Sequence, residues 1–213
     1  SVIMLIGAIP LILIKQKENK FPMSLGSAAG FILKKKNVPN IESFSGYAIE
    51  SIIGKVIWPV FLIIMLMQPQ RVGTIVTLSL VISIAVFYFI GKFTDRFDKY
   101  KIVKIGTLLY FFGWIGRIFA NTSLKVLLVD SYKNISEKIV RVPWEAVSYD
   151  IAVKQKYFEF VIMREVVYNL SRVIVLPLIM LVFVLDFHPF VVSFVIASLF
   201  TTLYSKIGEK KIA

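Results

Sequence analysis

Five charged side chains recur along one stretch of the sequence and could do chemistry together. They alternate in sign and stand three or four residues apart: Asp130, Lys133, Glu137, Arg141 and Glu145. This spacing places them along one face of a helix, where each charge neighbours one of opposite sign. Such a row could relay protons or hold a polar substrate, or its members could pair with one another. The sequence leaves both interpretations open.

A second group of polar residues lies in an apolar stretch further towards the N-terminus. Glu50 and Trp58 share a helical face with Tyr47 and Gly54. Aromatic rings beside a carboxylate line some sugar or cation sites, and elsewhere they only pack. The residues therefore predict either a contribution to a binding cavity or ordinary packing.

A third polar group follows the charged row. Glu165, Asn169 and Arg172 share a face in the apolar segment 160–185, and we expect Glu165 and Arg172 to pair with the charged row. Arg117, at the end of another apolar segment, is expected near the membrane surface. Glu50, Glu137 and Glu165 are candidates for proton coupling, with pairing to a neighbouring lysine or arginine as the alternative.

Several kinds of chemistry are excluded by composition. The chain has no cysteine, which removes disulfides, thiolate metal sites and cysteine nucleophiles. His188 is its one histidine, so a multi-histidine metal site is also excluded. No nucleophile motif is present, and we therefore predict no enzyme activity, no bound metal and no cofactor.

The composition indicates a membrane protein. Hydrophobic residues make up 57% of the 213 residues and the mean hydropathy is +0.78, whereas soluble domains are about 45–50% apolar. The apolar residues gather in long runs. A net charge of +12 suits either nucleic acid or an anionic membrane surface. The apolar runs favour the lipid bilayer as the partner, and nucleic acid is not expected.

Six apolar segments predict an all-α, polytopic membrane helix bundle over residues 41–213. The predicted spans are 43–67, 72–90, 102–120, 124–153, 160–185 and 189–204, of which the fourth is markedly polar. An apolar run at 1–14 is short for a span and is interpreted as the end of a truncated helix. Residues 15–40 are interpreted as a basic connector, rich in lysine and interrupted by glycine and proline.

The distribution of lysine and arginine predicts how the spans are oriented. Basic residues gather in 15–40, 91–101, 154–156 and after 204, whereas the intervening loops hold only Arg71. Because cytoplasmic loops carry an excess of lysine and arginine, the connector and the C-terminus are predicted to be cytoplasmic.

A compact charged stretch between the second and third predicted spans resembles a family signature. It reads GKFTDRFDKYK, and the residues that match the cytoplasmic loop of the major facilitator superfamily are Gly91, Asp95, Arg96, Lys99 and Lys101. Asp98 stands where that family usually has a second glycine, and Tyr100 where a basic residue is common. In the family, this signature joins the second and third helices of each six-helix half.

The resemblance implies a function and a partner. The chain looks like the C-terminal half of a twelve-helix transporter in a prokaryotic plasma membrane, and its partner would be the missing N-terminal half. Such a protein moves a small solute by alternating access around a site between the halves. An ionised side chain at mid-membrane costs about 2.5–3.5 kcal/mol, so the row from Asp130 to Glu145 is expected to face the first and fifth spans and a cavity. The alternative function is a non-transporting scaffold or sensor of the same fold.

Overall fold

The computed structural model describes residues 30–32 and 34–208, and every regular element among them is helical. The prediction of an all-α fold is confirmed for this part of the chain. The predicted truncated helix at 1–14, and the connector as far as residue 29, lie outside the described residues.

Six long helices follow one another through short connections. The elements are η1 (Lys35–Asn37), α3 (Val38–Leu66), α4 (Pro69–Arg96), α5 (Lys99–Arg117), α6 (Ser123–Lys154), α7 (Tyr157–Val184), α8 (Pro189–Thr201) and η2 (Thr202–Lys206). Each predicted span falls on one of the helices α3 to α8. Proline occupies the first turn of α3, α4 and α8, where its missing N–H group leaves no helical hydrogen bond unmade.

The charged stretch 91–101 is more helical than the predicted loop. α4 continues through Gly91 to Arg96, and α5 begins at Lys99, so only two residues separate them. The Asp98 side chain accepts a hydrogen bond from the Tyr100 backbone N–H at 2.9 Å and caps α5. The lysines and arginine here are adequate helix formers, and one capping carboxylate is enough to start the next helix.

Three helices are long and apolar enough to cross a membrane, judged by length and composition among the described residues. They cover Lys35–Leu66, Tyr157–Val184 and Pro189–Lys206. Large apolar side chains of α7 are exposed, including Leu170, Val173 and Leu178. An apolar surface of this kind suits contact with lipid, and the chain is a membrane protein.

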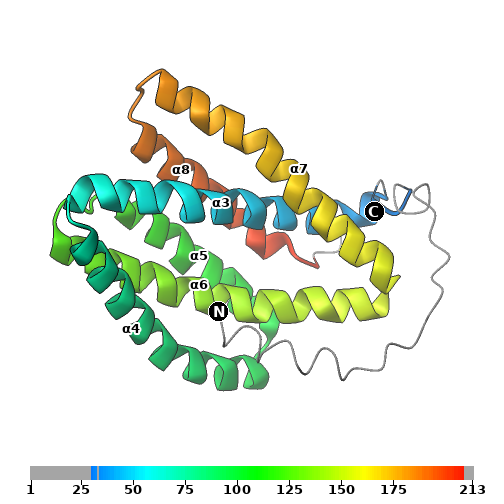
Figure 1. Ribbon diagram of the computed structural model, residues 1–213. Coiled ribbons are helices and arrows are strands. Elements are labelled where there is room, and N and C mark those ends of the chain that lie inside the picture. Colours follow the sequence, from blue (N-terminus) through cyan, green and yellow to red (C-terminus); the bar gives the residue numbers. More distant parts are fainter. Residues whose placement is uncertain (1–29, 33, 209–213) are drawn as a thin grey trace, which may run out of the picture.

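The helices form two groups around α3 (Figure 1). α7, α8 and η2 pack against α3, whereas α6 packs against α4 and α5, and α5 joins the groups through α8 and η2. The approach of α5 to α6 depends on Gly106, where a Cβ atom would lie 2.9 Å from the Cα atom of Val140. This close crossing brings the charged face of α6 against α5.

Candidate functional site

Four of the five charged residues of α6 form a continuous row of ion pairs, whereas Asp130 pairs with a residue of α5 rather than with Lys133. Lys133 Nζ lies 2.8 Å from a Glu137 oxygen, and Arg141 Nη1 lies 3.1 Å from the other Glu137 oxygen. Arg141 Nε then contacts Glu145 at 2.9 Å. Side-chain exposure rises along the row from 9% at Lys133 to 49% at Glu145, so the row leads from the interior of the bundle towards its surface.

The row faces inward at its buried end. Asp130 pairs with Arg117 of α5 at 2.7 Å, and Ser79 of α4 donates a hydrogen bond to the same carboxylate at 2.7 Å. The Arg117 guanidinium lies 3.8 Å from the Trp58 ring centroid and 4.4 Å from that of Trp114. Trp58 is therefore a packing partner for a buried cation, at 5% exposure, and does not line the cavity described below.

Arg117 ends α5, and its side chain lies inside the bundle at only 2% exposure, whereas its place near the membrane surface stays a prediction. Arg117 and Asp130 lie on opposite sides of the turn between α5 and α6, and they meet when the two helices pack side by side. Residue spacing within one helix cannot predict this pair, because the pair depends on how α5 and α6 cross.

Glu50 is the centre of a second buried polar group. It lies in α3 at 3% exposure and accepts hydrogen bonds from the Tyr110 hydroxyl of α5 and, at 3.0 Å, from the Tyr204 hydroxyl of η2. The Lys133 ammonium of α6 lies beside this group, 5.3 Å from the Tyr110 ring centroid. The two tyrosines were not identified from the sequence, although hydroxyl-bearing rings in apolar helices are the signal that could have found them.

The polar face of α7 differs from the predicted one by one residue. Arg164, Tyr168 and Arg172 are four residues apart, and both guanidinium groups lie within 6 Å of the Tyr168 ring centroid. Glu165 is exposed and contacts Arg164 at 3.2 Å, whereas Asn169 donates a hydrogen bond to the Glu165 backbone oxygen.

The expected pairing of Glu165 and Arg172 with α6 is therefore not seen among the described contacts. One residue rotates a helical position by about 100°, which is enough to move Glu165 from the inner face to the outer one.

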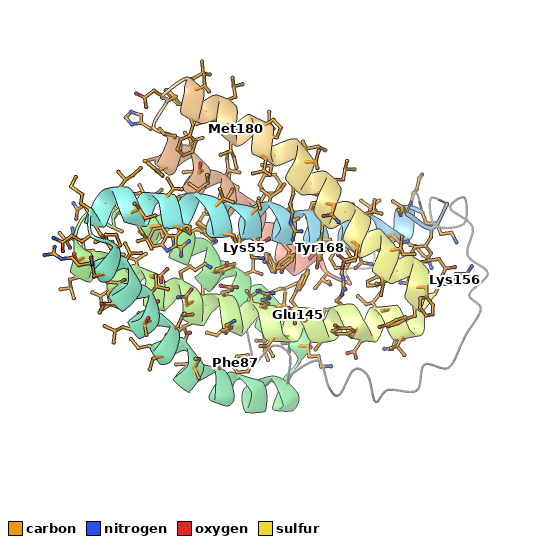
Figure 2. The ribbon with its side chains drawn as sticks, in the orientation of Figure 1. Lys55, Phe87, Glu145, Lys156, Tyr168 and Met180 are labelled. Atoms are coloured by element: carbon orange, nitrogen blue, oxygen red, sulfur yellow. The ribbon has the colours of Figure 1, made fainter. Side chains whose placement is uncertain are left out.

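A cavity of about 190 Å³ lies between α3, α6 and α7 at the exposed end of the charged row. Its lining combines aromatic rings, two charged groups and a serine: Tyr47, Trp144, Glu145, Ser148, Tyr149, Arg164 and Tyr168. Figure 2 labels Glu145 on α6 and Tyr168 on α7, on either side of the space between these helices. Arg141 Nη2 reaches Tyr47 with a hydrogen bond of 3.0 Å, which links the row to the cavity wall.

The residues of the signature-like stretch are only partly described. Gly91, Asp95 and Arg96 lie in the last turns of α4, and their side chains are outside the described part of the structure. Lys99 forms an ion pair with Asp150 of α6 at 2.8 Å, and Lys101 is exposed. This ion pair connects the stretch to the C-terminal end of α6, beyond the residues that line the cavity.

Within residues 30–32 and 34–208, no cluster of three histidine, cysteine, aspartate or glutamate side chains could hold a metal ion. The described side chains of the site can form hydrogen bonds, ion pairs and aromatic contacts. No known protein family, curated protein or solved structure matches this chain.

Proposed function

We propose that this chain is the C-terminal half of a major facilitator type transporter, which moves a small solute across a membrane by secondary active transport. The observation that carries the proposal is the charged row of α6. Its buried end is enclosed by α4 and α5, and its other end opens into a polar, aromatic cavity. The free energy of inserting a row of charges into a membrane bundle is lowest where the charges contact oppositely charged partners and water. A solute pathway provides both.

The proposal includes a topology of six spans, with the C-terminus in the cytoplasm of a prokaryotic cell. Support comes from the clustering of lysine and arginine on one set of connections. The cavity lies towards that side, since it is lined by the C-terminal half of α6 and the N-terminal half of α7. The partner half would supply the other wall of the solute pathway, as the resemblance implies.

Single introduced thiols test this topology, because the chain has no cysteine of its own. In a full-length protein freed of other cysteines, Lys35→Cys and Lys206→Cys should react with an impermeant thiol reagent only from the cytoplasmic side. His188→Cys, in the connection between α7 and α8, should react only from outside. Labelling of His188→Cys from the cytoplasm would refute the six-span arrangement.

Alternating access is tested at the cavity. Glu145→Cys should react with a water-soluble reagent, and its reaction rate should change when a transported solute is added. Val173→Cys, on the exposed apolar face of α7, is the matched control and should stay protected by lipid. Two results together would favour the scaffold or sensor instead. These are a thiol reaction rate at Glu145→Cys that no solute alters, and no solute uptake by vesicles containing the full-length protein.

The signature-like stretch has a place in the same proposal. Asp95 would bias the two conformations by closing the cytoplasmic side, and Asp95→Asn should slow uptake without loss of membrane insertion. Uptake equal to that of the unmodified protein would refute this role of Asp95. The transport proposal itself would still be tested by the vesicle experiment.

A further inference from the structure

A groove of about 440 Å³ lies between α5 and η2, separate from the cavity described above. Its lining residues come from these two elements and are Lys104, Thr107, Leu108, Phe111, Thr202 and Ser205. The volume equals roughly 15 water molecules at about 30 Å³ each, which is more than a single inorganic ion fills. The groove can therefore hold part of a larger, extended molecule.

The groove begins at one surface of the membrane. α8 and η2 together form an apolar segment long enough to cross a bilayer, and this segment ends at Lys206. α5 begins beside the same end, since a Cβ atom at Gly208 would lie 2.9 Å from the Tyr100 ring. Both walls of the groove therefore start where the chain meets a membrane surface.

Both walls change from polar to apolar with distance from this surface. In α5, Lys104 is followed by Leu108 and Phe111, at intervals of four and three residues that keep them on one helical face. In the opposite wall, Ser205 of η2 lies nearer the surface than Leu199 of α8, whose side chain is 57% exposed. A phospholipid has the same order, because its phosphate lies at the membrane surface and its acyl chains extend inwards.

The lysines beside the groove differ from their neighbours in their ion pairs. The Lys99 ammonium lies 2.8 Å from a carboxylate of α6, and that of Lys206 lies 2.7 Å from a carboxylate of α3. Lys104 lines the groove and Lys101 lies one turn nearer the surface, and neither pairs with a carboxylate in the part of the chain that the structure describes. Basic pockets between membrane helices bind the headgroups of anionic lipids, so these two lysines suit a phosphate group.

The hydroxyl groups of the groove favour a headgroup that donates hydrogen bonds. Thr202 and Ser205 donate to backbone oxygens at 2.6 and 2.8 Å, so their own oxygen atoms remain available as acceptors. The glycerol headgroup of phosphatidylglycerol carries free hydroxyl groups, whereas phosphatidylcholine has no hydroxyl donor. The two lipids therefore differ both in net charge and in what they can donate to η2.

We propose that the groove between α5 and η2 is a binding site for an anionic phospholipid of the surrounding membrane. The phosphate would lie at Lys101 and Lys104, and an acyl chain would lie along Leu108 and Phe111. This inference does not depend on the proposed transport function, since it requires only that α5 and α8 lie in a membrane.

Competition between two lipids with the same acyl chains tests the site. The purified protein is held in detergent micelles with equal amounts of dioleoyl phosphatidylglycerol and dioleoyl phosphatidylcholine, and bound lipid is identified by native mass spectrometry. We expect bound phosphatidylglycerol to exceed bound phosphatidylcholine. Lys104→Gln should weaken phosphatidylglycerol binding about fivefold, which corresponds to about 1 kcal/mol for one lysine at an anionic lipid surface. Equal binding of the two lipids to the unmodified protein would overturn the proposal.

A matched lysine distinguishes the groove from general attraction to a basic surface. Lys154→Gln removes an exposed lysine at the end of α6, outside the groove, and should leave the lipid preference unchanged. Thr202→Phe keeps every charge and places a ring in the groove, so it should also weaken phosphatidylglycerol binding. Equal losses for Lys104→Gln and Lys154→Gln, or no loss for Thr202→Phe, would refute a site in this groove.

A soluble phosphate ester separates a lipid from a free anion. Glycerol 3-phosphate has a phosphate and hydroxyl groups but no acyl chain to lie along Leu108 and Phe111. Dioleoyl phosphatidylglycerol should raise the melting temperature of the purified protein, and this rise should be smaller in Lys104→Gln. Glycerol 3-phosphate at the same concentration should not raise it. Equal rises with both compounds would show that the groove binds a soluble anion and would overturn its assignment to a lipid.

Discussion

The Arg117–Asp130 pair should be among the most costly contacts to break in this bundle. The side chains are 2% and 5% exposed, and their charged atoms lie 2.7 Å apart. Asp130→Asn keeps the size and the acceptor oxygen but removes the negative charge, so Arg117 is left buried without compensation. Two unit charges at about 4 Å interact by about 4 kcal/mol at the effective dielectric constant of protein sites. Breaking a buried pair typically costs about 3–5 kcal/mol.

The contacts of Arg117 with Trp58 and Trp114 persist in the variant, so they do not reduce this difference. For a domain of this size, about 1 kcal/mol shifts the melting temperature by roughly 2–4 °C, and Asp130→Asn should lower it by about 6–20 °C. The assay is thermal unfolding of the purified protein in detergent, followed by its tryptophan fluorescence.

A matched exposed pair provides the control for this measurement. Lys99 and Asp150 are nearly as close, at 2.8 Å, but their side chains are 36% and 53% exposed. Asp150→Asn should therefore cost at most about 1 kcal/mol. Replacing both buried partners, by Arg117→Met with Asp130→Leu, should recover most of the lost stability, because no unpaired charge remains. Equal losses for Asp130→Asn and Asp150→Asn would refute the assignment of Arg117 to a dry interior.

Two other perturbations have defined outcomes. Gly106→Ala should separate α5 from α6 and lower the melting temperature by several degrees, because the new Cβ atom would lie 2.9 Å from the Val140 backbone. Gly73→Ala is the control and should be neutral or slightly stabilising, because the space at its Cβ position is open. The same change in melting temperature for both variants would contradict the close crossing of α5 and α6. Glu50→Gln should cost about 1–3 kcal/mol, since the amide offers one acceptor oxygen to two tyrosine hydroxyls. Under the proposed transport function, with Glu50 as its proton-coupling group, the variant should lose solute accumulation driven by a pH gradient and keep solute exchange across vesicles. Unchanged accumulation would remove Glu50 from proton coupling.

The sequence contains enough information to predict the helices and the charged face of α6. Apolar runs give the positions of α3 to α8, and intervals of three and four residues place Lys133, Glu137, Arg141 and Glu145 together. These are local properties of a single helix, so periodicity is sufficient to find them.

The contacts between helices could not be predicted in the same way. Glu50 meets Tyr110 and Tyr204, which lie 60 and 154 residues further along the chain. The rotation of each helix decides such contacts, and a small error in rotation was enough to misplace Glu165. The cavity lining from α7 was missed for the same reason, since Arg164 and Tyr168 adjoin the residues that the sequence had favoured.

The distance along the chain between Glu50 and Tyr204 has a consequence for biosynthesis. Ribosomes add about 5–20 residues per second, so roughly 8–30 s separate the synthesis of the two residues. During that interval α3 enters the bilayer with a carboxylate that lacks one of its final donors. Arg117 and Asp130, only 13 residues apart, can pair as soon as their helical hairpin emerges. Tyr204 in η2 therefore completes the hydrogen bonding of a carboxylate made 154 residues earlier, and a ribosome that stops before Tyr204 leaves Glu50 without this donor.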